Sequence, residues 1–544
     1  MKRDLAQLGS TEHDLLIVGG GIHGLAAAYD AAQRGLRVAL VERGDFGSGA
    51  SFNHLKTVHG GLRYLQNADF PRMRESILER RTMARLAPHL VRPQGFLIGT
   101  YRSPTRSRTA MRVAFLVDAF IGRDRNGGLP PSLRLPAGRT VGRNACVRLF
   151  PGVPADGLTG GAIWHDYQMQ NSDRLTLAFA EAAAGQGAVA ANYVEAVDAI
   201  RKDGRVLGVR ARDLLGGAEL EVRARVTLNA AGSRAGPVMG AFGAPRSFLL
   251  IKAMNVVTSR PMDGLALGAR SPDGRVLFMV PWRGRMMVGT AQSANPCAPE
   301  DTSVTDEELQ AFLTEIDGTF PALQLAREEI TLVHRGGVPA VRCRDGRLDL
   351  QGHFEIVDHA RDGVAGAVSV IGVKYTTARH VAQAVVDVVA AKLSRPMAPC
   401  RTADLPLPGG ETADIDALVR EATAAAGDAL DPGTVRHLVE TYGTRYRAVL
   451  AVAAEDCAWK ERIEPSHPAV LAEVVHAVRD EMAQTLTDVL IRRLPMGSAA
   501  YPGHEAARRA AAVMQQELGW SQARVEQELE GLAAFYAPIV VDGR

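Results

Sequence analysis

Cysteine is scarce in this sequence, and its distribution excludes two kinds of site. The 544 residues include five cysteines, which are widely scattered and form no Cys-x-x-Cys pair. Such spacing supports neither a disulfide framework nor a thiolate metal centre, and it suits a reducing cytoplasm. We therefore predict a cytoplasmic protein without a bound metal.

Long apolar runs are also missing. No uninterrupted apolar stretch approaches the roughly 18 residues that a membrane-spanning helix needs. The N-terminal segment MKRDLAQLGSTEHD has a basic start but no apolar run behind it. We expect neither an export signal nor a transmembrane helix.

A strong charge of either sign is absent too. The chain has 63 lysines and arginines against 60 aspartates and glutamates, which leaves a net charge of +3. This balance gives no argument for nucleic acid as a partner. A composition of 46% hydrophobic and 23% charged residues is that of a globular protein. The length exceeds one simple core, so two or three domains are expected.

The N-terminal segment carries a nucleotide-binding pattern. Residues 14–43 read DLLIVGGGIHGLAAAYDAAQRGLRVALVER, in which a short apolar strand runs into Gly19-x-Gly21-x-x-Gly24. An alanine-rich helix follows, and a second strand ends at Glu42. The glycines permit a tight turn and close approach of a pyrophosphate, the helix N-terminus favours anions, and Glu42 can accept ribose hydroxyls. The pattern predicts a βαβ nucleotide site but does not separate NAD from FAD.

Cationic residues surround a pair of glycines shortly after this unit. The stretch HLKTVHGGLRYLQ, residues 54–66, places Lys56, His59 and Arg63 around Gly60-Gly61. A solvated charged turn is one interpretation. The alternative is that the glycines let the backbone approach a flat cofactor while the side chains face an anionic substrate.

The rest of the chain indicates an interleaved α/β fold with a helical end. Strand-like runs between 186 and 232, around 250–293 and near 367–371 alternate with helical patterns, and the Pro- and Gly-rich segment 401–412 is the clearest boundary. We predict a Rossmann-like nucleotide-binding domain interleaved with a mixed β-sheet substrate domain, followed by an α-helical C-terminal domain. The predicted ranges within 1–400 are 14–100, 186–240 and 345–400 for the nucleotide-binding domain and 101–185 and 241–344 for the substrate domain, with 401–412 as linker and 413–544 as the helical domain.

One segment has the composition of a surface-binding helix. Residues 101–125 place six arginines around the apolar sequence AMRVAFLVDAFI. Such a basic amphipathic stretch can rest on an anionic membrane surface, as a peripheral membrane protein does. A helix packed on its own domain, with solvated arginines, explains the same pattern.

Several motifs together resemble one family. The blocks DLLIVGGGIHG, KTVHGGLRYL, NAAG, VPWRGRMMVGTA, GVKYTTAR, PLPGG and VVHAVRDEMAQTLTDVLIRR run in the same order as in the FAD-dependent glycerol-3-phosphate dehydrogenase and oxidase family, which belongs to the glycine-oxidase-like flavoproteins. They extend from residue 14 to about residue 495. The resemblance implies a flavoprotein oxidoreductase of glycerol metabolism with non-covalent FAD.

The resemblance also implies a set of cofactor-binding residues. The ADP half of FAD would lie at the glycine motif and Glu42, and the isoalloxazine would lie near the His59 segment and the turn that begins at Gly372. The predicted FAD-binding residues are Gly19, Gly21, Gly24, Glu42, Arg43, Ser51, Lys56, Gly60, Gly61, Leu62, Val194, Ala231, Gly232, Gly372, Lys374, Tyr375, Thr376 and Thr377.

Family members oxidise a secondary alcohol beside a phosphate and pass the electrons to quinone or oxygen. This chemistry needs a base for the hydroxyl proton and positive charge for the phosphate. His59 is the predicted base, and Lys374 and Arg63 complete the predicted catalytic group. The predicted substrate-binding residues are Tyr64, Arg335, Arg342 and Thr376.

Two departures from the family pattern concern the substrate. Where the family generally has an arginine that grips the phosphate, this chain has Val338, in the sequence RGGVPA. The segment 165–175 carries Gln168, Gln170 and Asn171 where the family tends toward acidic residues. A valine cannot bind phosphate, so Arg335 or Arg342 must reach the same space, or the substrate lacks a phosphate.

Three functions therefore compete. The first is a dehydrogenase of glycerol 3-phosphate or a related polyol phosphate, with quinone or another electron acceptor. The second is a flavin oxidase or dehydrogenase of a non-phosphorylated hydroxy or amino compound. The third is a flavin-binding regulatory protein without turnover, against which the presence of His59 and Lys374 argues. A homodimer and a peripheral position on the inner face of the cell membrane are further expectations.

Overall fold

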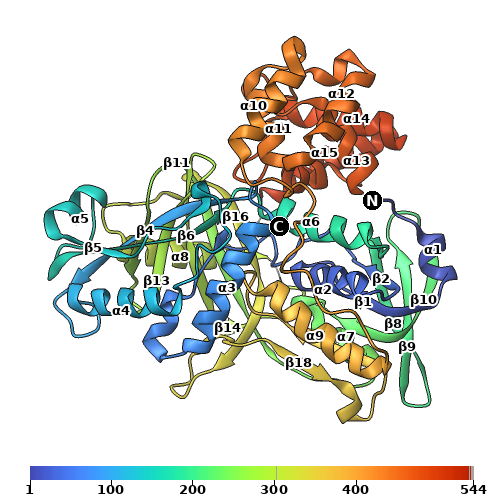
Figure 1. Cartoon of the computed structure of the whole chain (residues 1–544), viewed down its shortest axis with the longest axis horizontal. Helices are drawn as coiled ribbons and strands as arrows, with labels where there is room; N and C mark the ends of the chain where they lie inside the picture. The colour runs from blue at the N-terminus through green and yellow to red at the C-terminus, as the bar shows by residue number, and fades with distance from the viewer. Residues whose placement is uncertain (302, 538, 541–544) are drawn as a thin grey trace.

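The computed structural model describes residues 1–301, 303–537 and 539–540. Two β-sheets with their helices form the main body, and the helices that follow residue 414 form a lobe beside it, drawn in orange and red in Figure 1. The chain therefore has the interleaved α/β architecture with a helical C-terminal domain that the sequence predicts.

The nucleotide-binding sheet is parallel at its centre. Its main strand order is β18-β19-β10-β1-β2-β7, in which β19 to β7 are parallel and the edge strand β18 is antiparallel to β19. The central strands are buried apolar runs, as expected for a sheet covered on both faces. The strands are β1 (His13–Val18), β2 (Val38–Val41), β7 (Val189–Ala191), β10 (Glu219–Asn229), β18 (Glu355–Asp358) and β19 (Ala367–Ile371), with β8 (Val194–Lys202) and β9 (Arg205–Asp213) as a hairpin that extends from β10.

Three helices cover one side of this sheet. Helices α2 (Ile22–Gln33), α6 (Ser172–Gly185) and α9 (Ala378–Leu393) share one apolar core with β1, β2 and β10. The small side chains of α2 allow this close packing, and a Cβ at Gly24 would overlap the Gly19 carbonyl oxygen. Helices α1 (Leu5–Ser10) and α7 (Ala235–Phe242) lie against other parts of the same domain.

The second sheet has ten strands and is mostly antiparallel. Its order is β17-β16-β11-β14-β13-β12-β4-β6-β3, and β5 pairs with β6. Helix α8 (Asp306–Thr319) packs against this sheet, and its Thr305 capping box fixes its start. The strands are β3 (Thr57–Val58), β4 (Val91–Tyr101), β5 (Arg139–Gly142), β6 (Leu158–Met169), β11 (Leu249–Pro261), β12 (Ala266–Arg270), β13 (Val276–Trp282), β14 (Arg285–Pro296), β16 (Ile330–Arg342) and β17 (Leu348–Leu350).

The remaining elements are helical, apart from a pair of two-residue strands, β15 (Val304–Thr305) and β20 (Ile539–Val540). The main body adds helices α3 (Phe70–Leu86), α4 (Arg108–Ile121) and α5 (Arg143–Leu149). Short 3-10 turns include η1 (Leu62–Asn67) and η3 (Gly232–Arg234). The C-terminal lobe consists of α10 (Ile415–Ala426), α11 (Pro432–Tyr442), α12 (Tyr446–Glu455), α13 (Leu471–Glu481), α14 (His504–Leu518), α15 (Gln522–Phe535) and the π-helix η9 (Asp488–Arg493).

Two features differ from the sequence-based expectations. Strands β3 and β4 belong to the second sheet, although residues 14–100 were assigned to the nucleotide-binding domain, and α6 packs on α2 rather than in the substrate domain. Strand pairing decides the first placement and helix packing decides the second, and sequence periodicity reports neither. Helix α13 ends at Glu481, before Met482 with its left-handed backbone, and the π-helix η9 follows.

Within the described part of the chain, every helix is too short or too polar to cross a membrane. The predicted range of the helical domain extends to residue 544, and its positions 538 and 541–544 lie outside the described residues.

Candidate functional site

The glycine motif forms the turn between β1 and α2. Gly19 has φ +110°, which side-chain-bearing residues rarely adopt, and a Cβ there would lie 2.6 Å from the Ala230 carbonyl oxygen. Gly21 is the N-cap of α2, and the Ile22 amide donates to Ser51 Oγ at 2.9 Å. The Ile22 amide is thus bonded to Ser51, which lies at the helix end where the sequence predicts a cofactor contact.

Glu42 lies at the end of β2, as a ribose-binding carboxylate requires. Its Oε2 accepts the Gly20 amide at 2.6 Å, and its Oε1 accepts the Gly44 amide at 2.7 Å. Burial raises the pKa of Glu42, although these two amides oppose the shift. The carboxylate is thus oriented by the backbone on either side of it.

Other predicted cofactor residues border the same end of the sheet. The Val194 amide donates to the Glu42 carbonyl at 2.7 Å, and the exposed Arg43 approaches Glu195 at 3.7 Å. Ala231 donates its amide to Asn229 Oδ1 at 3.1 Å. These contacts fix the backbone around the predicted nucleotide site.

The structure leaves space at a second glycine segment. Gly232 has φ +60°, and no heavy atom of the described residues lies within 4 Å of the position that a Cβ would take. A Cβ at Gly372 would overlap the His23 ring, and burial lowers the pKa of His23 to about 4. The buried Nε2 of His23 has no hydrogen-bond partner among the described residues. An open cradle, a neutral ring and a helix N-terminus beside a carboxylate fit FAD.

The His59 segment brings the predicted base among positive charges. Burial and then the charges of Arg63 and Lys374 hold the pKa of His59 well below its usual value. Arg80 and Arg72 act in the same direction. The His59 imidazole is therefore neutral near pH 7 and can accept a proton. Its backbone amide donates to Thr376 Oγ1 at 3.3 Å, which joins this segment to the predicted Gly372–Thr377 turn.

Tyr64 is the centre of the cation cluster. Lys374 Nζ lies 4.4 Å from the ring centre, Arg72 Cζ lies 4.2 Å from it, and Arg63 Cζ lies 5.3 Å from it. Burial raises the pKa of Tyr64, but Arg63 and Lys374 outweigh it and leave the pKa below its usual value. Burial lowers the pKa of Lys374, while Tyr64 opposes that shift. We call His59, Arg63, Tyr64, Arg72 and Lys374 the cation cluster.

Contacts and backbone geometry within the protein explain both glycines of the Gly60-Gly61 pair. A Cβ at Gly60 would overlap the guanidinium of Arg80, which forms an ion pair with Asp166. Asp166 also accepts the Gly60 amide at 2.6 Å. Gly61 has φ +75° and begins the η1 turn that carries Leu62 and Tyr64. Packing alone thus requires both glycines, and their contact with the flavin stays a prediction.

Lys56 does not join the cation cluster. Its ammonium group donates to the Phe52 carbonyl and, at 3.0 Å, to Ser172 Oγ, and it lies 4.2 Å from the centre of the Phe52 ring. The side chain is fully buried, and burial lowers the pKa of Lys56 to about 8. The charge of Lys56 is therefore directed into the protein and away from the cation cluster, and its contact with the cofactor stays a prediction.

The turn after β19 holds its hydroxyls inside the protein. The Tyr375 hydroxyl lies 2.8 Å from Thr176 Oγ1 and donates to the Ser172 carbonyl at 3.2 Å. Thr376 is buried and meets the His59 amide, and Thr377 is the N-cap of α9. This turn therefore positions Lys374 beside His59.

Strand β16 places the two predicted arginines apart. The Arg335 amide donates to Asn53 Oδ1 at 3.1 Å, next to the His59 segment. By strand alternation Arg335 and Val338 point to opposite faces of β16, and the role of Arg335 in substrate binding stays a prediction. Arg342 is exposed at the end of the strand and donates to the Gly346 carbonyl at 3.0 Å.

The sequence did not reveal Arg72 as a member of the cation cluster. Arg72 lies in the first turn of α3, whose N-cap is Asp69, and the helix folds back over η1. Asp69 indicates where helix α3 begins, but the local sequence does not show that α3 packs back over η1. His54 packs at a tilt against Tyr375, with 5.1 Å between ring centres, a contact that the sequence did not indicate.

A dinucleotide-binding sheet, a large antiparallel sheet and a neutral histidine among cations are the arrangement expected of an FAD-dependent oxidoreductase. Comparison with known families supports this class: the family described as FAD dependent oxidoreductase matches residues 14–388, and the C-terminal domain of alpha-glycerophosphate oxidase matches residues 400–525. The chain belongs to the FAD-dependent glycerol-3-phosphate dehydrogenase family. It is an oxidoreductase with FAD as its cofactor.

Relatives match the chain over almost its full length. The glycerol-3-phosphate dehydrogenase of Synechocystis is 30% identical and covers 97% of both chains. Glycerol-3-phosphate dehydrogenase 2 of Mycobacterium tuberculosis is 32% identical, over 97% of this chain and 88% of the relative. The FAD complex of the Bacillus halodurans glycerol-3-phosphate dehydrogenase shares the fold, with a TM-score of 0.76, 24% identity and coverage of 98% of this chain and 96% of that chain.

Proposed function

We propose that the protein oxidises the secondary alcohol of glycerol 3-phosphate or a related polyol phosphate. The observation that carries the proposal is the cation cluster, in which a neutral His59 stands beside Arg63 and Lys374. A phosphate provides the negative charge that this arrangement attracts, and the imidazole provides the base that the alcohol needs. The names of the relatives point to the same substrate.

We assign each of these residues its own role in the reaction. His59 accepts the hydroxyl proton of the substrate as the carbinol C–H bond breaks, and the carbon becomes a ketone. When bound, FAD supplies the acceptor for the hydride. The charges of Lys374 and Arg63 stabilise the oxygen as its proton leaves, because opposite charge at short range lowers the energy of a developing anion.

The position of the phosphate follows from the same charges. Arg72 and Lys374 approach the Tyr64 ring within 4.2 and 4.4 Å, so both cations lie against the same phenol. Arginine binds a phosphate through two parallel hydrogen bonds, whereas lysine acts as a point charge. We assign Arg72 to the role of the arginine that is missing at Val338.

Val338 supports a second candidate function. A hydroxy or amino compound without phosphate needs no arginine at this position, and Val338 on β16 offers an apolar surface instead. A carboxylate would then take the place of the phosphate beside Lys374.

One experiment separates the two functions. The oxidised holoenzyme is mixed without oxygen with glycerol 3-phosphate, glycerol, lactate or glycine, and bleaching of the flavin absorbance is followed. We expect rapid bleaching by glycerol 3-phosphate and at most slow bleaching by glycerol. Bleaching by lactate or glycine but not by glycerol 3-phosphate would show that the second function is right.

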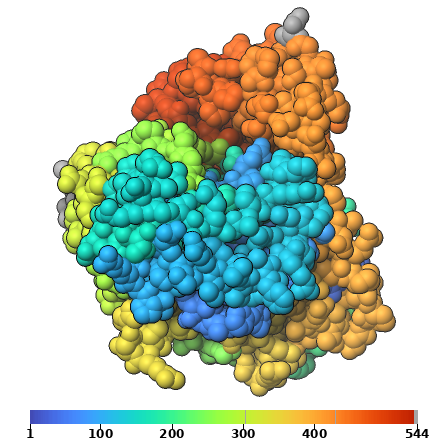
Figure 2. Space-filling model, turned by 60° about the vertical axis from the view of Figure 1, so that its left-hand side comes forward, coloured from blue at the N-terminus to red at the C-terminus, as the bar shows by residue number. Residues whose placement is uncertain are grey.

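We also propose that the protein rests on an anionic membrane surface and passes its electrons to quinone. Val113, Leu116 and Phe120 on α4 are 55%, 71% and 74% exposed, and their spacing puts them on one helix face. Exposed Arg102, Arg106, Arg112 and Arg123 flank that face. The blue-to-teal part of the chain that includes α4 covers much of the face turned to the viewer in Figure 2.

The charge and the apolar side chains act on different parts of a bilayer. Arginines attract anionic headgroups, and the apolar face enters the boundary with the acyl chains. A lipid-soluble quinone is the acceptor that a protein in this position can reach.

A further inference from the structure

A buried carboxylate joins the nucleotide-binding loop to the C-terminal lobe. Asp45 follows Glu42 by three residues, and its side chain has no exposed surface. Asp45 Oδ2 accepts hydrogen bonds from Arg492 Nε and Arg493 Nη1, both at 2.7 Å. Its Oδ1 accepts from Arg493 Nη2 at 2.9 Å and from Asn192 Nδ2 at 3.0 Å. Four donors therefore saturate this carboxylate.

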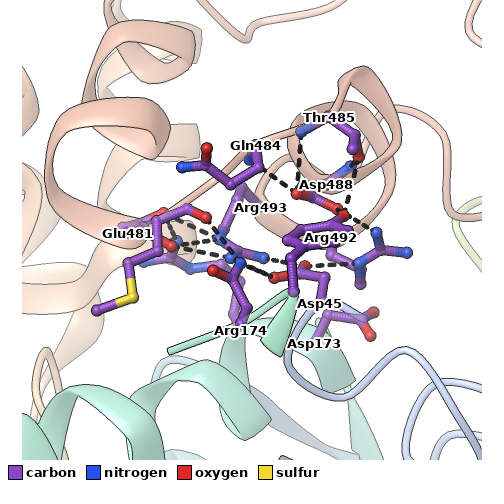
Figure 3. Close-up of polar contacts among 12 residues, drawn as sticks. Asp45, Asp173, Arg174, Glu481, Gln484, Thr485, Asp488, Arg492 and Arg493 are labelled. Carbon is purple, nitrogen blue, oxygen red and sulfur yellow. Dashed lines mark hydrogen bonds and ion pairs between the residues drawn. The ribbon is translucent and has the colours of Figure 1, made fainter. Parts of the chain in front are cut away.

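Both arginines come from the π-helix η9. Figure 3 shows their side chains reaching Asp45 from the ribbon of the C-terminal lobe. Arg492 also pairs with Asp488, and Arg493 Nη2 donates to the Glu481 carbonyl at 2.8 Å. Contacts within the C-terminal lobe thus fix both arginines, so Asp45 binds a rigid pair of guanidinium groups.

The loop that carries Asp45 is the loop that shapes the nucleotide site. The Gly44 amide donates to the Glu42 carboxylate, and the Gly44 carbonyl accepts the Tyr193 amide at 3.0 Å. The Gly47 amide donates to the Gly20 carbonyl at 2.9 Å. Residues 42–47 therefore connect Glu42, the glycine turn and Asp45 in one short segment.

We propose that Asp45 is a positioning residue for FAD. Arg492 and Arg493 hold the 42–47 loop in the conformation that presents Glu42 to the ribose, so docking of the C-terminal lobe and binding of FAD stabilise each other. The coupling is reciprocal, because two events that favour one conformation of a shared loop must favour each other. The C-terminal lobe then takes part in cofactor binding through this one carboxylate.

The first test is the affinity for FAD. Asp45→Asn keeps the size of the side chain and removes its charge, and Arg493→Lys keeps the charge and removes the paired hydrogen bonds. We expect FAD to dissociate from the Asp45→Asn holoenzyme with a Kd raised about tenfold, within the usual range of coupling between sites. Arg493→Lys should show a smaller increase, and it replaces Asp45→Asn if that variant fails to fold.

The matched control weakens the same lobe contact elsewhere. Arg174 on α6 donates to both oxygens of Glu481 at 2.6 Å and lies outside the 42–47 loop. Arg174→Lys should lower thermal stability as the other variants do, but it should leave the Kd for FAD within twofold. An equal rise of the Kd in Arg174→Lys and Asp45→Asn would overturn the proposal, because general loosening of the lobe would then explain both.

The second test asks whether Asp45 acts through Glu42. In a double-mutant cycle, Asp45→Asn should raise the Kd for FAD much less in a Glu42→Gln background than in the wild type. Hydrogen exchange supplies an independent readout: amides of residues 484–494 should exchange faster when FAD is removed, and Asp45→Asn should abolish this difference. Additive effects in the cycle together with FAD-independent exchange at residues 484–494 would show that Asp45 is only structural.

Discussion

Lys374 Nζ lies 4.4 Å from the centre of the Tyr64 ring, although the two residues are 310 positions apart in the chain. Lys374 follows the last strand of the nucleotide-binding sheet, whereas Tyr64 follows the first short strand of the second sheet. Their contact closes the space between the two sheets around His59. The proposed substrate site therefore depends on how the sheets are joined.

Removing a cation from this site should weaken substrate binding. A hydrogen bond to a charged group contributes about 1.5–3 kcal/mol, which corresponds to a change in KM of about 10- to 150-fold. We expect Lys374→Met and Arg72→Gln each to raise KM for glycerol 3-phosphate in this range. Lys392→Met, which removes a lysine paired with Asp358 at the far end of α9, should leave KM unchanged. Steady-state kinetics with an artificial electron acceptor measures KM for the three variants. Equal KM for all of them would contradict the roles assigned to Lys374 and Arg72.

His59→Asn should slow flavin reduction about a hundred- to ten-thousand-fold with a small effect on KM, since it removes the proton acceptor. The pKa of His59 is lowered, so its imidazole is already unprotonated at pH 6.5. Protonation of His59 should therefore reduce wild-type kcat/KM only at lower pH. Stopped-flow reduction across pH 5–8 checks both statements. A variant that reduces its flavin at the wild-type rate would exclude His59 as the base.

Glu42→Arg should weaken FAD binding because it removes an acceptor for ribose hydroxyls and places a cation near the Gly20 and Gly44 amides. We expect the Kd for FAD to rise at least tenfold, in line with the loss of a charged hydrogen bond. Fluorescence titration of the flavin-free protein measures the Kd. Glu195→Gln, which changes a carboxylate paired with Arg43 and Arg212, is the control and should bind FAD normally.

Leu116→Asp should reduce sedimentation with anionic vesicles, because it puts a charge in the centre of the exposed apolar face of α4. The wild-type protein should bind phosphatidylglycerol vesicles at low salt and dissociate as salt screens the arginines. Val197→Asp, at a similarly exposed valine on β8, should bind as the wild type does. Equal recovery of the wild type with neutral and anionic vesicles would speak against a membrane role.

Acid should destabilise the fold partly through His89. Burial, with Arg174 and Arg92 nearby, lowers the pKa of His89 to about 3, whereas an unfolded histidine titrates near 6.5. The unfolded state therefore binds more protons below pH 6.5, and stability is lost as the pH falls from 6.5 toward 3. Between pH 7 and 5, His89→Gln should lose about 2 kcal/mol less unfolding free energy than the wild type, as measured by urea unfolding. Identical losses would show that His89 is not held neutral.

The parts of the fold that could be predicted from sequence are those with a local cause. The βαβ unit is visible because Gly19, Gly24 and Glu42 occupy fixed distances around an alanine-rich helix. The cation cluster was recognised in part because Arg63 and Tyr64 are neighbours of His59. Arg72 was missed because a helix must fold back over η1 before its guanidinium reaches Tyr64.

Strand partners and buried charges were the least predictable features. Nothing in the sequence near β4 indicates that it pairs with β6 rather than with the nucleotide-binding sheet. Lys56 is adjacent to cluster residues in sequence, yet its side chain turns to Ser172, more than a hundred positions away. Contacts of this kind depend on the whole fold, so a pattern within one segment does not specify them.

The order of strands in the nucleotide-binding sheet has a consequence for protein synthesis. Strand β1 lies between β2 and β10, and β10 in turn needs β19, whose last residue is Ile371. A nascent chain that ends before this residue contains the glycine turn but lacks the complete β19, through which the edge strand β18 joins the sheet. Pairing between such distant segments is slow, because closing a long loop costs entropy before the strand contacts can stabilise the sheet. We therefore expect the complete sheet beneath the glycine turn to form only after Ile371 has been synthesised.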